Sequence, residues 1–314
     1  MRTPRRDNGG AFLPLDMNDH PKTALIVEGG GMRGIFAAGV LHAFGCADFD
    51  PFDLYIGVSA GACHLASHLA GQNDRNFDIT LRYSLAPEFI NLLRFLKGGH
   101  LMDLDWMWQE TIAHDRLNLR QFGEKMRSRN KEFLIVVTSM QTGRALYLRA
   151  DEHSLEHDLK VSSALPILYR KTLDVGTEKA IDGGVADALP VREAQRRGAT
   201  DITVIRSRPA HYVKKKNWIA LAILSIYFRR YPQLVKAFKT RAENYNASVA
   251  FLRHPPTGLC VREVVPPPGW TIGRTTKDEA ALRAAYETGI RQGEAFIKRW
   301  DGPLVPGGRR NGMP

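Results

Sequence analysis

The stretch FDLYIGVSAGACHLASHLA, residues 52–70, decides the fold class of this chain. Residues 52–58 are apolar and rich in β-formers, which predicts a strand, whereas the small residues after position 59 predict a helix. Gly57 and Gly61 flank Ser59, each separated from it by one residue, so the chain has room to turn sharply there. We therefore expect the Ser59 hydroxyl to stand above the end of a strand, at the N-terminus of the helix.

Strands and helices alternate along the rest of the chain. Strands are expected at 23–30, 131–140, 143–150 and 201–208, and helices at 32–44, 75–96, 103–113, 190–199 and 276–300. A chain that alternates in this way forms a mostly parallel sheet covered by helices on both faces. The sequence therefore predicts the α/β class.

The composition is typical of a folded protein in a reducing compartment. Hydrophobic residues make up 44% of the 314 residues, enough for a large core. The three cysteines, Cys46, Cys63 and Cys260, are too few and too far apart for a disulfide framework. We see no secretory signal and no apolar run of the roughly 18 residues that a membrane span needs. We expect one domain over 22–300 between flexible tails at 1–21 and 301–314, in a cytoplasmic protein that contacts membranes at most peripherally.

Positive charge is concentrated in one segment. The formal net charge is +11, and residues 206–241 carry +10 of it with no Asp or Glu. The cations there are Arg206, Arg208, Lys214, Lys215, Lys216, Arg229, Arg230, Lys236, Lys239 and Arg241. Such a segment favours an anionic partner, either a membrane surface or a nucleic acid.

An apolar run, 218–228, lies inside this basic segment and is too short to span a bilayer. One interpretation is a surface helix that docks on anionic lipid; the other is a core helix whose charged ends reach solvent. A nucleic acid is the least favoured partner of this segment, because the aromatic residues lie in an aliphatic run and are not spaced for base stacking. On the first interpretation, the residues expected at the membrane are Lys214, Lys215, Lys216, Trp218, Arg229 and Arg230.

A glycine-rich loop follows the first expected strand. Gly29, Gly31 and Gly34 have the spacing G-x-G-x-x-G at the start of a helix, where free N–H groups favour negative charge. That charge is either a pyrophosphate or the oxyanion of an acyl-transfer intermediate. For a dinucleotide site, the acidic residue expected about 20 positions later would be Asp48, Asp50 or Asp53.

The pattern G-x-S-x-G around Ser59 is typical of a nucleophile elbow, and a serine nucleophile needs a base. Asp182, followed by Gly183 and Gly184, is the candidate base; an Asp-Gly-Gly sequence is also common in plain turns. Asp187 is a weaker candidate for the same role. The order Ser59, Asp182, then His211 or His254 also permits a Ser-His-Asp triad.

Three blocks together, Gly29–Gly34, Gly57–Gly61 and Asp182–Gly184, resemble the signature blocks of the patatin-like phospholipase family, in the same order. SSALPIL, 162–168, resembles a further block of the family, and the opening EGGGMRGIF is similar to that of small bacterial members. The resemblance implies a three-layer α/β/α sandwich with a mostly parallel central sheet and a Ser–Asp dyad that uses no histidine, metal or cofactor. It makes Ser59 the nucleophile and Asp182 the base. The oxyanion hole would be formed by Gly29, Gly30, Gly31, Met32, Arg33 and Gly34.

By this resemblance the chain is a lipid acyl hydrolase, of phospholipase A, lysophospholipase or carboxylesterase type, working through an acyl-enzyme. Its partners would be an acyl ester and an anionic membrane surface, with no nucleic acid. The alternatives are a Ser-His-Asp esterase, a dinucleotide-binding protein and a non-catalytic membrane-binding module. The sequence does not specify the head group, the acyl position, the chain length or the oligomeric state.

Overall fold

The computed structural model describes residues 21–128 and 130–303, so the tails expected at 1–21 and 301–314 fall almost wholly outside the described residues. One sheet forms the centre, in the order β5-β6-β3-β2-β1-β7-β8, with β4 paired to β3. The strands are β1 (Thr23–Val27), β2 (Leu54–Val58), β3 (Glu132–Ser139), β4 (Ala145–Arg149), β5 (Leu173–Val175), β6 (Glu178–Asp182), β7 (Asp201–Ile205) and β8 (Cys260–Val264). The pairs from β3 through β2, β1 and β7 to β8 are parallel, and β4, β5 and β6 pair antiparallel.

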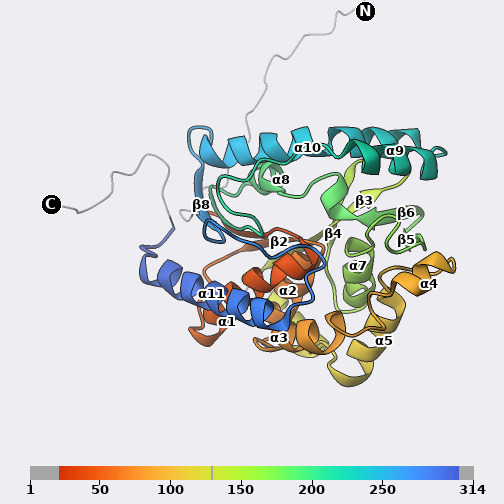
Figure 1. Ribbon diagram of the computed structural model, residues 1–314. Helices are drawn as coiled ribbons and strands as arrows, with labels where there is room; N and C mark the ends of the chain where they lie inside the picture. The colour runs from red at the N-terminus through yellow and green to blue at the C-terminus, as the bar shows by residue number, and fades with distance from the viewer. Residues whose placement is uncertain (1–20, 129, 304–314) are drawn as a thin grey trace, which may run out of the picture.

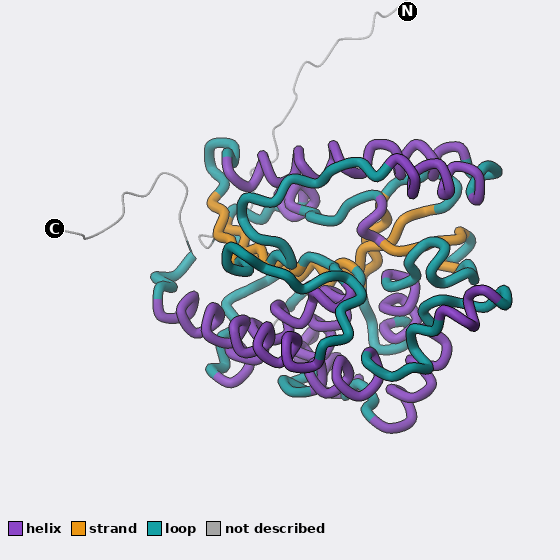
Figure 2. Tube along the Cα trace, viewed as in Figure 1, coloured by secondary structure: helices purple, strands orange, loops and turns teal. Residues whose placement is uncertain are grey.

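Helices cover both faces of this sheet (Figures 1 and 2). One face is covered by α1 (Ile35–Cys46), α2 (Ala60–Leu69), α6 (Leu119–Ser128), α7 (Leu155–Ser162) and α11 (Glu279–Lys298). The other face is covered by α8 (Val191–Arg196) and α10 (Pro232–Arg253). The short helices α3 (Arg75–Ile79), α4 (Leu92–Leu96), α5 (Leu104–His114) and α9 (Trp218–Tyr227) lie farther out.

The core explains why the central strands are apolar throughout. Leu25 and Val27 of β1 pack into the core on the α1 side, and Ala24 and Ile26 pack into the core on the α10 side. Every residue of β1, β2 and β7 is buried, as expected for parallel strands covered on both faces. The predicted α/β/α sandwich with a mostly parallel sheet is confirmed.

The expected helix over 75–96 is wrong in its middle. The structure has α3, then a π-helical turn at Thr80–Ser84, then an irregular stretch before α4. Pro87 lies in that stretch. Proline removes a backbone donor and disfavours helical backbone in the residue before it, so the apolar pattern alone was misleading here.

The apolar run in the basic segment forms α9, and no residue of this helix is buried. Leu221 and Leu224 pack partly against buried Phe228 and its neighbours, while Trp218 and Ile219 are 71% and 77% exposed. The core-helix interpretation is therefore wrong for α9. Within the described residues, every helix is too short or too polar to cross a membrane.

Candidate active site

Strand β3 brings the ends of β2 and β6 together. Val58, the last residue of β2, pairs with Val136, and Asp182, the last residue of β6, pairs with Val137. Because β4 occupies the opposite edge of β3, β2 and β6 lie on the same edge, end to end. Ser59 directly follows Val58, so the sheet itself places the candidate nucleophile beside the candidate base, and both line one cavity.

Ser59 stands on a strained turn between β2 and α2. Its φ of 54° and ψ of −128° are unusual for a residue with a side chain, and such strain is concentrated at functional sites. The turn packs so closely that a Cβ on Gly61 would lie 2.4 Å from the carbonyl oxygen of Val27. A Cβ on Gly57 would lie 2.4 Å from Cα of Ala62. These contacts explain the two glycines of the elbow.

Ser162 holds the elbow in place. Its hydroxyl accepts a hydrogen bond of 2.8 Å from the N–H of Ser59 and donates one of 2.6 Å to the carbonyl oxygen of Val136. Its side chain is fully buried. Ser162 belongs to the stretch 162–168 that resembles a further block of the family, but the sequence assigned it no role; the structure makes it the link between the elbow and β3.

The Asp182 carboxylate is fixed through one oxygen only. Oδ1 accepts a hydrogen bond of 2.8 Å from the N–H of Gly184, and the side chain is 2% exposed. Oδ2 is buried and has no hydrogen-bond partner among residues 21–128 and 130–303. The backbone is held by Thr138, whose hydroxyl donates to the carbonyl oxygen of Asp182 at 2.9 Å. A buried carboxylate with one unsatisfied oxygen, in a cavity that Ser59 also lines, can accept a proton.

The glycine loop lies against Ser59. A Cβ on Gly29 would lie 2.9 Å from Cβ of Ser59, so only glycine fits there. The N–H of Met32 donates to the carbonyl oxygen of Arg274 at 3.1 Å. For the N–H groups of Gly30 and Gly31, the described part of the chain offers no acceptor. These two groups are therefore the best-placed oxyanion donors in the loop.

Four cationic side chains line the same cavity, where the sequence predicted only one. They are Arg33, Lys214, Arg241 and Arg274. Burial, reinforced by nearby Arg208 and Arg274, lowers the pKa of Arg33 to about 10. Burial, reinforced by Arg241, lowers the pKa of Lys214 to about 7. The cavity is thus strongly electropositive beside Ser59.

Lys214 differs from the two lysines that follow it. Its side chain is half-buried and lines the cavity, with Nζ 4.6 Å from the centre of the Tyr245 ring. Lys215 and Lys216 are exposed. The sequence predicted all three lysines at a membrane surface, whereas the structure places Lys214 apart from the other two.

An apolar pocket opens on the other side of Ser59. It shares Gly31, Ser59, Leu165 and Arg274 with the cationic cavity. Its apolar lining comes mainly from residues 89–108, which include the first turns of α5, with Phe89, Ile90, Met102, Leu104, Met107 and Trp108. Ser59 therefore lies between a cationic cavity and an apolar pocket.

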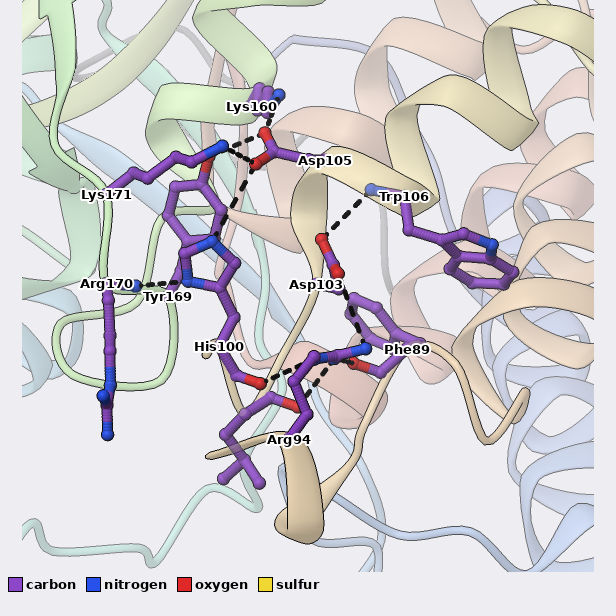
Figure 3. A network of polar contacts seen from close by, with 11 residues as sticks. Phe89, Arg94, His100, Asp103, Asp105, Trp106, Lys160, Tyr169, Arg170 and Lys171 are labelled. Atoms are coloured by element: carbon purple, nitrogen blue, oxygen red, sulfur yellow. Dashed lines mark hydrogen bonds and ion pairs between the residues drawn. The ribbon is translucent and has the colours of Figure 1, made fainter. Parts of the chain in front are cut away.

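A polar network anchors the segment that lines the apolar pocket (Figure 3). Asp105 accepts hydrogen bonds from Lys160, Lys171 and Tyr169 at 2.6, 2.5 and 2.8 Å. Burial of Asp105 opposes its ionisation, but these hydrogen bonds outweigh burial and hold its pKa well below the ordinary range. Arg94 ties the α4 loop to the carbonyl oxygens of His100 and Phe89. The pocket wall is thus held by charge-assisted hydrogen bonds.

The alternative bases lie elsewhere. Asp187 accepts a hydrogen bond of 2.8 Å from Tyr147 and does not line the cavity; burial raises its pKa. His211 and His254 are exposed and also lie outside the cavity lining. His64, which no sequence signal singled out, lines the apolar pocket, and burial lowers its pKa to about 4, so it is neutral at pH 7.

The aspartates considered for a dinucleotide site are at the wrong end of the sheet. Asp53 precedes β2 and accepts a hydrogen bond from the N–H of Thr23 at 2.8 Å, whereas the glycine loop follows β1 at the opposite end. Asp50 pairs with Lys125 and Lys131, and Asp48 lies in an exposed turn. The described residues contain no group of three His, Cys, Asp or Glu side chains arranged to hold a metal ion.

Known solved structures share features of this fold. Human group IVD cytosolic phospholipase A2, solved with a methyl γ-linolenyl fluorophosphonate inhibitor, is 11% identical, with a TM-score of 0.46 over 91% of this chain and 60% of that one. VipD from Legionella pneumophila is 12% identical, with a TM-score of 0.44 over 89% of this chain and 67% of that one.

Sequence comparisons are more direct. Uncharacterized protein YjjU of Escherichia coli K12 is 32% identical over 291 residues, which cover 92% of this chain and 81% of that protein. A domain of unknown function, DUF6363, matches residues 231–303. The patatin-like phospholipase family matches residues 25–194, which include the glycine loop, the elbow and Asp182. The chain belongs to the patatin-like phospholipase family.

Proposed function

We propose that this chain is a lipid acyl hydrolase in which Ser59 is the nucleophile and Asp182 the general base. One observation carries the proposal: the two residues lie at the abutting ends of β2 and β6 and line one cavity, with Oδ2 of Asp182 unpartnered among the described residues. Membership of a phospholipase family supports a lipid ester as the substrate class.

The mechanism follows from this arrangement. Asp182 accepts the hydroxyl proton as Oγ of Ser59 attacks the ester carbonyl, and the N–H groups of Gly30 and Gly31 stabilise the oxyanion. The ester C–O bond then breaks, the leaving alcohol takes the proton from Asp182, and an acyl-enzyme remains. Water attacks that ester with Asp182 again as base, which releases the fatty acid and restores Ser59. Burial of both residues excludes bulk water from the dyad.

The apolar pocket beside Ser59 would hold the acyl chain. The proposal is tested with a fluorophosphonate probe and a soluble p-nitrophenyl ester. We expect the probe to label the wild-type protein and not Ser59→Ala, and Ser59→Ala to lose ester hydrolysis by about a thousandfold or more. His211→Ala and His254→Ala should keep most of the wild-type rate. A folded histidine variant with collapsed kcat would instead favour the Ser-His-Asp triad.

We also propose that α9 docks the enzyme on anionic membranes. Its exposed side includes Trp218, Ile219, Ile223, Ile226 and Tyr227. The exposed cations Lys215, Lys216, Arg229 and Arg230 flank this apolar side at both ends of the helix. An apolar helix face bordered by Lys and Arg complements a membrane with acidic head groups, and each cation near such a surface contributes about 1 kcal/mol.

A further inference from the structure

The cavity beside Ser59 holds more positive charge than the protein itself neutralises. Arg33, Lys214, Arg241 and Arg274 line it, and none of the four forms an ion pair with another described residue. Two other cations of the sheet region are paired: Arg206 lies 2.7 Å from Glu263, and Arg262 lies 2.6 Å from Asp201. The distinctive feature of this cavity is that four cations without a carboxylate partner line it together.

The carboxylates of the cavity do not compensate for these cations. Glu28 and Asp182 are the acidic residues of its lining, against four cations. Glu28 is already engaged, because its Oε2 accepts a hydrogen bond of 2.8 Å from the N–H of Ser207. Asp182 is the proposed base. Unpaired cations in a buried cavity are costly unless an anion joins them.

Arg241 and Lys214 are held in place by hydrogen bonds and not by carboxylates. Arg241 donates from Nε to the carbonyl oxygen of Gly184 at 2.7 Å. The backbone N–H and C=O of Lys214 bond to the side chain of Asn246 at 2.9 and 3.0 Å. Arg33 is 7% exposed and its buried Nε has no hydrogen-bond partner among the described residues. Burial and the neighbouring arginines lower the pKa of Arg33, Lys214 and Arg241, so an anion bound among them would stabilise their charged forms.

The position of the cations relative to Ser59 indicates which part of a substrate they contact. With the acyl chain in the apolar pocket and the carbonyl oxygen at the N–H groups of Gly30 and Gly31, the alcohol part of the ester extends into the cationic cavity. We propose that Lys214, Arg241 and Arg274, together with Arg33, bind a phosphate group on that alcohol, so that the preferred substrates are acyl esters of glycerol phosphate type. This inference rests on the proposed function of Ser59 and names its substrate class.

The inference also gives a role to the C-terminal part of the chain. Lys214, Arg241 and Arg274 all lie outside residues 25–194, which match the phospholipase family. Arg241 is on α10 and Arg274 precedes α11, both within the matched domain of unknown function at 231–303. That segment packs against the phospholipase part and inserts cations beside its nucleophile. We infer that it determines head-group specificity.

The test compares two soluble esters that differ only in the phosphate: 1-hexanoylglycerol 3-phosphate and 1-hexanoylglycerol. We expect the wild type to have a kcat/KM at least about tenfold higher on the phosphate ester, since only that ester can accept charge-assisted hydrogen bonds from the cavity cations. Lys214→Met should reduce this preference about tenfold. Arg274→Gln, whose backbone carbonyl contact with Met32 is retained, should reduce it similarly. Lys239→Met is the matched control, since Lys239 is exposed and in the same basic segment.

Two outcomes of the kinetic comparison overturn the inference: a wild type with no preference for the phosphate ester, or variants that lose both activities equally. A second measurement separates this inference from the proposed function. Ether-linked 1-hexylglycerol 3-phosphate cannot be hydrolysed, and it should bind the wild type more tightly than Lys214→Met in isothermal titration calorimetry. If neither ester is hydrolysed but this binding holds, the proposed function fails and the phosphate site stands. If inorganic phosphate binds as tightly as the ether, the site serves a free anion and the substrate inference is wrong.

Discussion

The N–H of Ser59 donates a hydrogen bond of 2.8 Å to Oγ of Ser162, which in turn donates to the carbonyl oxygen of Val136. One buried hydroxyl thus joins the strained elbow to the strand that also pairs with Asp182. The position of the nucleophile relative to the base depends on this link, because it ties Ser59 to Val136 of β3, and Asp182 pairs with the next residue, Val137.

Ser162→Ala should therefore damage catalysis more than stability. The substitution leaves the buried N–H of Ser59 unsatisfied, which costs roughly 1–3 kcal/mol, and lets the elbow shift. We expect kcat on a p-nitrophenyl ester to fall at least about tenfold, with a modest fall in Tm. Ser248→Ala is the control, because Ser248 is also a buried serine, its hydroxyl accepts a hydrogen bond of 3.3 Å from Arg192, and it lines neither cavity. An unchanged kcat in Ser162→Ala would show that the elbow holds its geometry without the link.

The identity of the base is tested by a pair of matched substitutions. Asp182→Asn keeps the shape of the side chain but removes the proton acceptor, so we expect ester hydrolysis to fall by about a thousandfold or more. Asp187→Asn should keep most of the activity, because Asp187 bonds to Tyr147 and does not line the cavity. Steady-state kinetics measure the loss, with circular dichroism as the folding control. Comparable losses in both variants would argue against Asp182 as the specific base.

Much of this site follows from local sequence signals. The elbow at Ser59 and the loop at Gly29–Gly34 lie at strand-to-helix junctions, where short-range patterns of glycine and apolar residues are informative. The strand ending at Asp182 was less visible, because Asp-Gly-Gly is common in turns. Its role depends on antiparallel pairing with β3, which is a long-range contact.

The cationic cavity illustrates what the sequence did not reveal. Arg241 and Arg274 come from α10 and from the loop before α11, far from Ser59 in the chain. Lys214 sits beside Lys215 and Lys216 in a uniform basic run, and nothing in that run indicates which lysine turns inward. Only tertiary packing distinguishes Lys214 from its two neighbours. Here the hydrogen bonds between Asn246 and the backbone of Lys214 fix this residue.

The membrane proposal for α9 predicts a loss of vesicle binding when its exposed side becomes polar. Trp218→Ser with Ile219→Ser removes two large apolar groups from an exposed face and should weaken sedimentation with vesicles rich in anionic lipid. Arg229→Glu with Arg230→Glu should weaken it further at low salt, since the attraction is screened as salt increases. Activity on vesicle lipid should fall more than activity on a soluble ester. Unchanged sedimentation in both double variants would contradict docking through α9.

The phosphate site predicts a pH dependence that is absent for neutral esters. In the free protein, burial and then Arg241 lower the pKa of Lys214 to about 7, with Arg274 and Arg33 acting in the same direction and Glu28 opposing them. As the pH rises through 7, Lys214 loses its proton and the cavity binds an anion less tightly. A phosphate monoester already carries its second charge there, since its second pKa is about 6. We therefore expect kcat/KM on 1-hexanoylglycerol 3-phosphate to decline above pH 7.

Bound phosphate should also change the pH dependence of kcat. A bound phosphate stabilises the protonated form of Lys214, so the descending limb in kcat should move to higher pH than the limb in kcat/KM, which reports the free enzyme. Lys214→Met should remove the limb from the phosphate ester, and 1-hexanoylglycerol should lack it even with the wild type. Steady-state kinetics between pH 6 and about 9 measure all three profiles. A limb that persists unchanged in Lys214→Met would assign the titration to another group and contradict the role of this lysine in binding the phosphate.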